Sequence, residues 1–205
     1  MASNALQPEH PIYIGAVAVR VEHNADAQSI KPTLLARIVA GDVAALDDSL
    51  RQLWAPLLTY IVGILGSRDE AEDIAQEAFI RLWDNRKKLD AGGSLAGFVY
   101  RAARNLAISR LRSARVSDRT ALALSNDQDL TVSIELEDDA LHGPLAEKLR
   151  ELPPRRREIL LLHVVHELSY KDIAAMLGIA PQTVANQCTT ALASLRGSVR
   201  KDMMV

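Results

Sequence analysis

The side chains best suited to chemistry in this chain are arginines and lysines that gather in one stretch of the sequence. Between Arg81 and Arg119 there are ten basic and three acidic residues, whereas residues 120–142 hold six acids and no arginine or lysine. Grouped guanidinium and ammonium ions neutralise phosphates, so the pattern indicates a nucleic-acid surface followed by an acidic connector. The net charge of -2 conceals this separation.

A helix-turn-helix pattern covers residues 168–188. Ile173 and Leu177 belong to the apolar stripe of a first short helix, and Gly178 suits the left-handed residue that ends it. Pro181 suits the opening turn of a second helix. In DNA-binding proteins of this kind, the second helix enters the major groove.

The sequence offers no constellation for catalysis or metal binding, so we expect neither an enzyme nor a cofactor. The single cysteine, Cys188, excludes an internal disulfide framework and a multi-cysteine zinc site, and we expect it to be a buried small apolar residue. His163 and His166 lie three residues apart without further ligands, so we assign no metal. The apolar run 12–21 is too short to span a bilayer, and we expect a cytoplasmic protein.

Apolar residues that recur at intervals of three and four predict an all-α fold, with two small helical domains joined by a flexible acidic linker. The expected domains are residues 32–115 and 144–205, with the linker at 116–143. Within the first domain, Ser67 is predicted to begin a helix that ends near Asn85, and Ser94 one that runs to about Ser113. We expect residues 1–31 to be a disordered extension, with a short strand or a partner-binding segment as the alternative.

Three motifs, in order along the chain, carry a family resemblance. They are Asp69–Trp83 (DEAEDIAQEAFIRLW), Phe98–Ala107 (FVYRAARNLA) and Leu152–Leu160 (LPPRRREIL), the last followed by the helix-turn-helix. Together they resemble the extracytoplasmic-function (ECF) sigma factors of bacterial RNA polymerase over roughly residues 34–200. The resemblance implies a factor that binds the beta and beta-prime subunits of core polymerase, recognises promoter DNA, initiates transcription and is commonly held by an anti-sigma factor.

The resemblance also implies three sets of contact residues. The set expected to bind core polymerase is Glu72, Asp73, Gln76, Glu77 and Ile80. The set expected at the -10 element, where a loop holds a flipped base, is Arg86, Lys87, Lys88, Arg101, Arg104, Asn105, Arg110 and Arg112. The set expected at the -35 element is Lys171, Gln182, Thr183, Asn186, Gln187, Thr190 and Arg196.

Several alternatives remain at this point. The acids of the polymerase-binding set could form a solvated helix face, and Phe98 and Tyr100 could be core residues instead of stacking groups. Residues 181–195 carry no charge, unlike the usual recognition helix of the family, so this helix could bind protein instead of DNA. The chain as a whole could be a stand-alone helix-turn-helix regulator that does not join polymerase.

Overall fold

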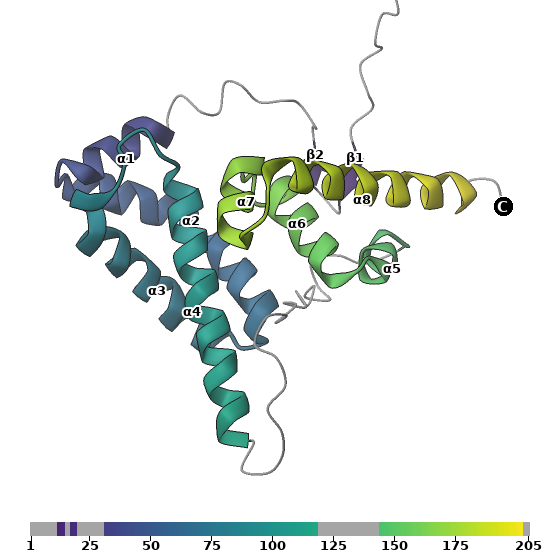
Figure 1. Ribbon diagram of the computed structural model, residues 1–205, viewed down its shortest axis with the longest axis horizontal. Coiled ribbons are helices and arrows are strands. Elements are labelled where there is room, and N and C mark those ends of the chain that lie inside the picture. The colour runs from purple at the N-terminus through teal and green to yellow at the C-terminus, as the bar shows by residue number, and fades with distance from the viewer. Residues whose placement is uncertain (1–11, 15–16, 20–30, 119–143, 203–205) are drawn as a thin grey trace, which may run out of the picture.

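The computed structural model describes residues 12–14, 17–19, 31–118 and 144–202, and helices make up most of these ranges (Figure 1). The N-terminal half contains β1 (Ile12–Ile14), β2 (Val17–Val19), α1 (Lys31–Val39), α2 (Val43–Leu65), α3 (Arg68–Asn85), the 3-10 helix η1 (Arg86–Lys88) and α4 (Leu95–Asp118). The C-terminal half contains α5 (Pro144–Glu151), α6 (Pro154–Val164), α7 (Tyr170–Leu177) and α8 (Pro181–Asp202). The predicted all-α class is confirmed, with one small hairpin added.

Side-chain caps and left-handed glycines set the ends of the helices. Ser67 Oγ and Ser94 Oγ each accept a hydrogen bond from the backbone N–H three residues later, at 3.4 and 2.9 Å. Each bond satisfies one of the N–H groups that a helix start leaves without a partner. Gly178, at φ 67°, ends α7, and Pro181 begins α8. The helix starts predicted at these two serines and the predicted turn of the helix-turn-helix are therefore confirmed.

Two elements differ from expectation. Strands β1 and β2 pair in antiparallel register, with Ile12 opposite Val19, where disorder was the preferred prediction for residues 1–31. The alternating β-branched residues that left a strand as the alternative favour this pairing. Helix α4 runs to Asp118, past the expected end near Ser113, because no glycine or proline interrupts it there. The rest of the expected extension and the acidic linker from residue 119 onward lie outside the described residues.

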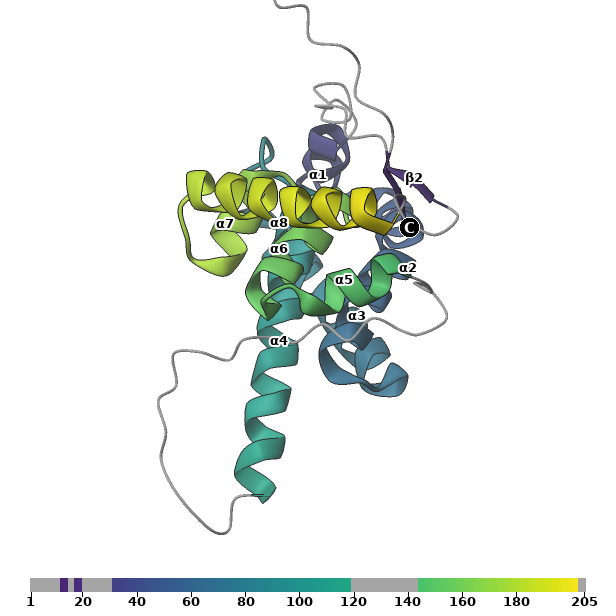
Figure 2. The same ribbon diagram turned by 90° about the vertical axis from the view of Figure 1, so that its right-hand side faces the viewer.

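The two helical halves share one hydrophobic core. Buried residues of α2 and α4, such as Leu57 and Val99, belong to the same cluster as Leu162, Leu168 and Ile173 of the C-terminal half. A smaller cluster holds α5 and α6 against α8. Helix α4 packs directly on α7 and then extends beyond the rest of the molecule, as both views show (Figures 1 and 2). The two halves are thus closed on each other along α2 and α4.

Candidate nucleic-acid interface

One face of α3 presents acidic and amide groups around an exposed apolar side chain. We call it the acidic face: Glu72, Asp73, Gln76, Glu77 and Ile80. Ile80 is 54% exposed, and Asp73 and Gln76 are also exposed. Glu72 and Glu77 are half-buried and pair with Arg68 and Arg81, one turn away, at 3.1 and 2.9 Å. The other side of the helix is buried in the core, so this face is available to a partner.

A groove of about 340 Å³ lies where the end of α3, η1 and the start of α4 meet. We call it the basic groove: Arg81, Asn85, Lys88, Leu89, Phe98, Arg101, Ala102 and Asn105. Its charged residues are all basic, and its two asparagines carry both donors and acceptors. Phe98 is half-buried, with the Arg101 guanidinium 6.0 Å from its ring centre. Cations, amides and an aromatic edge are the groups that bind single-stranded nucleic acid.

The loop beside the basic groove is anchored at its first residue. The Arg86 guanidinium lies 4.1 Å from the Trp83 ring centre and donates a hydrogen bond to the Trp83 carbonyl oxygen at 2.6 Å. Farther along, Asp90 Oδ1 accepts a hydrogen bond from the Gly92 N–H at 3.0 Å, which shapes the turn. Lys87 and Lys88 are exposed. Arg86 therefore supports the loop, while the two lysines are the cations that it offers to a ligand.

The other expected -10 residues lie on α4 in different surroundings. Arg101, Asn105 and Arg112 are exposed. Arg110 is exposed too, but its Nε lies 3.2 Å from Glu70 Oε1 of α3, so the two helices are joined on this side. Arg104 is only 7% exposed and faces the C-terminal half of the molecule.

The expected -35 residues lie along the first turns of α8. Gln182, Thr183, Asn186 and Thr190 are exposed, and Gln182 donates a hydrogen bond to Asn186 Oδ1 at 3.0 Å. Gln187 Oε1 accepts a hydrogen bond from Arg156 Nε at 2.9 Å, so this amide is partly engaged already. Lys171 is exposed on α7, and the side chain of Arg196 lies outside the described residues. Over residues 181–195 the exposed side chains of this helix carry no charge.

The buried side of α8 includes the single cysteine. Cys188 is fully buried, and burial raises the pKa of its thiol to about 11. The prediction that it packs as a small apolar residue is confirmed, because the protonated thiol adds no charge to the core.

Comparison with known proteins matches both halves of the chain to one family. Residues 49–116 match the family described as Sigma-70 region 2, and residues 142–195 match the one described as Sigma-70, region 4. The ECF RNA polymerase sigma factor SigW of Bacillus subtilis (strain 168) is 31% identical over 180 residues, covering 80% of this chain and 94% of SigW. The chain belongs to the ECF sigma factors. It is therefore a promoter-directing subunit of bacterial RNA polymerase, and sigma factors are initiation factors and not catalysts.

Solved structures support the fold of this ECF sigma factor. CnrH, solved in complex with the cytosolic domain of CnrY, aligns with a TM-score of 0.53 at 19% identity, over 84% of this chain and 98% of CnrH. The sigma factor RpoE, solved with the anti-sigma factor NepR from Bartonella quintana, aligns with the same TM-score at 21% identity, over 75% and 96%. Below, region 2 denotes helices α1–α4 and region 4 denotes helices α5–α8.

A buried carboxylate of this sigma factor joins region 4 to region 2. Glu158 of α6 has no exposed surface and accepts four hydrogen bonds from three residues. Arg104 Nε of α4 donates at 2.7 Å, the Tyr60 O–H of α2 donates at 3.2 Å, and Arg155 of α6 donates at 3.2 Å. Burial acts to lower the pKa of Arg104, but the hydrogen bond and charge of Glu158 outweigh it, so this pKa is raised and the guanidinium stays charged.

An aromatic group adjoins this ion pair. Tyr60, Tyr100 and His166 have ring centres 5.3 to 5.5 Å apart, and the Tyr100 hydroxyl lies 3.1 Å from His166 Nδ1. Burial lowers the pKa of His166 to about 4, so the imidazole is neutral near pH 7. Tyr100 is 1% exposed, which favours its interpretation as a core residue over a stacking group in this arrangement. His163 is engaged elsewhere, against Tyr170 and the Leu168 carbonyl.

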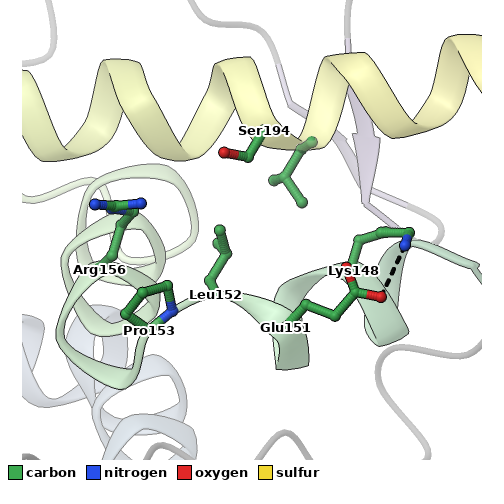
Figure 3. Close-up of a pocket in the computed structure, with 7 residues that line it drawn as sticks. Lys148, Glu151, Leu152, Pro153, Arg156 and Ser194 are labelled. Atoms are coloured by element: carbon green, nitrogen blue, oxygen red, sulfur yellow. Dashed lines mark hydrogen bonds and ion pairs between the residues drawn. The ribbon is translucent and has the colours of Figure 1, made fainter.

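A second hollow, of about 300 Å³, lies within region 4 between α5, the start of α6 and α8 (Figure 3). The side chains that line it are Lys148, Glu151, Leu152, Pro153, Arg156, Ser194 and Leu195. Lys148 Nζ and Glu151 Oε1 are 2.7 Å apart at one edge, so much of its charge is internally compensated. Within the described ranges, no three histidine, cysteine or acidic side chains gather as metal ligands, and no helix is long and apolar enough to cross a membrane.

Sequence reasoning did not single out Glu158, and it grouped Arg104 with the expected DNA contacts. The two lie 54 positions apart, and nothing in either segment identifies the other as its partner. The available signal was a single acid after the three arginines 155–157, directly before the apolar run 159–162. An acid that lies on the same side of a helix as an apolar run faces the core. A carboxylate buried there needs a cationic partner, because it has lost its hydration.

Proposed function

We propose that this ECF sigma factor recruits core RNA polymerase through the acidic face and reads promoters with the basic groove and α8. In this proposal residues 32–115 bind core polymerase and the -10 element, residues 144–205 bind the -35 element, and residues 116–143 connect them, with residues 1–31 as an N-terminal extension. The protein acts in the cytoplasm, where polymerase and promoter DNA are found. The observation that carries the proposal is a groove whose charged residues are all cations, beside an acidic face on the same helix.

The acidic face suits the clamp helices of the beta-prime subunit. Its carboxylates favour a basic partner surface and set the orientation and rate of encounter. Ile80 is the apolar group on this face, and since it is 54% exposed, burying the rest of its side chain adds roughly 1–1.5 kcal/mol. In this proposal Ile80 supplies the apolar part of the affinity of this face, and Asp73 and Gln76 supply polar contacts that add affinity and specificity.

The basic groove suits a base flipped out of the non-template strand of the -10 element. Asn85 and Asn105 have amide groups for a base edge, Phe98 offers part of a ring for stacking, and Lys88 and Arg101 neutralise flanking phosphates. Each phosphate neutralised on a single strand contributes a slope of about 0.7 to the dependence of log affinity on log salt. Binding at this groove is therefore expected to be strongly sensitive to salt.

Helix α8 suits the reading of base edges at the -35 element, with little attraction to the phosphate backbone of the DNA. Gln182 and Asn186 can pair with adenine edges, and the N-terminus of the helix can meet a phosphate. The missing charge is compensated by tethering, because a region 4 attached to bound polymerase has a high effective concentration at the promoter. Since CnrH and RpoE were solved with CnrY and the anti-sigma factor NepR, we also propose an anti-sigma partner for this chain.

The test is transcription in vitro with purified core polymerase and a genomic fragment library, with new start sites mapped by sequencing. The proposal requires new starts that share a -35 and a -10 element. The double variant Asp73→Ala/Gln76→Ala should bind core about tenfold more weakly with an unchanged circular dichroism spectrum. Glu147→Ala, which removes an exposed acid from region 4, is the matched control. If the chain binds DNA but not core, it is a stand-alone regulator.

A further inference from the structure

One amide of α8 is held in a fixed direction by a cation from another helix. Arg156 of α6 donates a hydrogen bond from Nε to Gln187 Oε1 of α8 at 2.9 Å, and both side chains are half-buried. Arg156 lies between the two helices, at the edge of the hollow that α5, α6 and α8 enclose (Figure 3). A guanidinium has donors and no acceptor, so the amide of Gln187 must turn its oxygen, and not its amino group, toward Arg156.

Two exposed amides of the same helix have no such constraint. Gln182 donates a hydrogen bond to Asn186 Oδ1 at 3.0 Å, so this bond joins one amide to another. If both amides turn over, the same side chains form a bond of opposite direction, and either arrangement leaves an oxygen and an amino group for DNA. Gln182 and Asn186 therefore keep the acceptor and donor that the reading of adenine requires. Gln187 differs from them because its oxygen is already directed at a cation.

Gln187 lies on the side of α8 that is expected to face DNA. It comes four residues after Thr183 and three before Thr190, and residues at these spacings share one side of a helix. Both threonines are exposed. Since the oxygen of Gln187 is turned toward α6, its amino group is the part left to contact a base edge. The charge of Arg156 also polarises this amide, which makes the amino group a stronger donor than that of a free glutamine.

We propose that Arg156 is a positioning residue for base recognition, and that it makes Gln187 a reader of guanine in the -35 element. This inference rests on the proposed function, because it names the base that one side chain of α8 reads. Guanine presents two acceptors in the major groove, whereas adenine presents one acceptor beside an amino group and cytosine presents an amino group. An amide that offers only N–H groups matches the guanine edge. It leaves the amino group of adenine or cytosine without an acceptor.

The test measures base preference at one promoter position at a time with the complete holoenzyme. The promoter recovered with the wild-type protein is made as a library in which each -35 position carries every base in turn, and transcripts are counted by sequencing. The ratio of guanine to adenine transcripts at a position does not depend on how much of a variant is active. Gln187→Ala identifies the position that Gln187 reads.

Three variants then test the role of the cation. Arg156→Ala removes the donor, and Arg156→Lys keeps a donor that can reach Gln187 Oε1. Arg150→Ala is the matched control, because it removes a cation of region 4 at an exposed position of α5.

We expect the wild type to prefer guanine at one -35 position and Gln187→Ala to lose this preference. Arg156→Ala should lower the guanine-to-adenine ratio at the same position at least about fivefold, because the released amide can turn its oxygen to adenine. The other positions should not change, and Arg156→Lys and Arg150→Ala should keep the wild-type ratio. An equal loss of transcription from every library member in Arg156→Ala would overturn the positioning role, since a purely structural or phosphate contact acts in that way. A response at a different position, or a wild-type preference for adenine there, would overturn it as well.

Failure of this inference differs from failure of the proposed function. If the wild-type protein with core yields no shared promoter elements, the proposed function fails and the inference falls with it. If shared elements are found but no -35 position responds to Gln187→Ala, the inference alone fails.

Discussion

The ion pair between Arg104 and Glu158 allows a quantitative prediction about stability. The Glu158 side chain is fully buried and that of Arg104 is 8% exposed. Replacing Glu158 with leucine leaves a buried guanidinium without its counter-ion, which costs about 3–5 kcal/mol in comparable buried pairs. Replacing Arg104 as well, with methionine, removes that charge, and apolar replacement of a buried pair is often neutral or stabilising. The double variant should therefore recover at least about 2 kcal/mol relative to Glu158→Leu, even though the Tyr60 hydroxyl loses its acceptor.

The assay is urea unfolding followed by circular dichroism at pH 7, with the free energy of unfolding obtained by linear extrapolation. The matched control is the pair of Arg110 and Glu70, which also joins two helices, at 3.2 Å, but has side chains 57% and 41% exposed. Water screens this pair, so Glu70→Gln should cost less than about 1 kcal/mol. If Glu158→Leu costs no more than Glu70→Gln, or if the double variant is as unstable as the single one, the buried ion pair does not form in solution.

Three further predictions concern single groups. Burial lowers the pKa of His166 in the folded protein to about 4, below its ordinary 6.5. The neutral imidazole therefore contributes its full stability above pH 6.5, and this contribution is lost as the pH falls toward 4. Thermal melts over this range should show a falling melting temperature, and His166→Gln should make that fall smaller. Arg101→Ala should lower the salt slope of single-stranded DNA binding by about 0.7, whereas Ser113→Ala, also on α4, should leave it unchanged. Cys188 should resist thiol reagents at neutral pH in the folded protein and react in denaturant, and rapid labelling of the native state would contradict its burial.

Local features of the sequence predicted most of the fold. The serine caps of α3 and α4, together with Gly178 and Pro181 of the helix-turn-helix, act over three or four residues, so their signals are complete within a short window. The acidic face was also predictable, because helical spacing alone brings its residues to one side of α3. The hairpin was harder to predict, since two strands of three residues carry little periodicity.

The contact between the regions was not predictable from local pattern. The sequence placed Arg104 in a run of cations, and such a run indicates DNA binding whether or not one member faces another domain. The structure distinguishes Arg104 from Arg101 because α4 has one side on the basic groove and another on region 4. That division depends on where region 4 packs, which is a tertiary property. The same applies to Gly97 of α4, where a Cβ would lie 2.3 Å from Asp172 Oδ1 of α7.

The neutral exposed face of α8 has a consequence for how the protein searches the genome. Nonspecific binding to duplex DNA is driven almost entirely by counter-ion release, and residues 181–195 have no cation with which to release any. This stretch of α8 therefore adds little to the binding of sites that do not match its target, and nonspecific attraction in region 4 falls to cations outside it, such as Lys171.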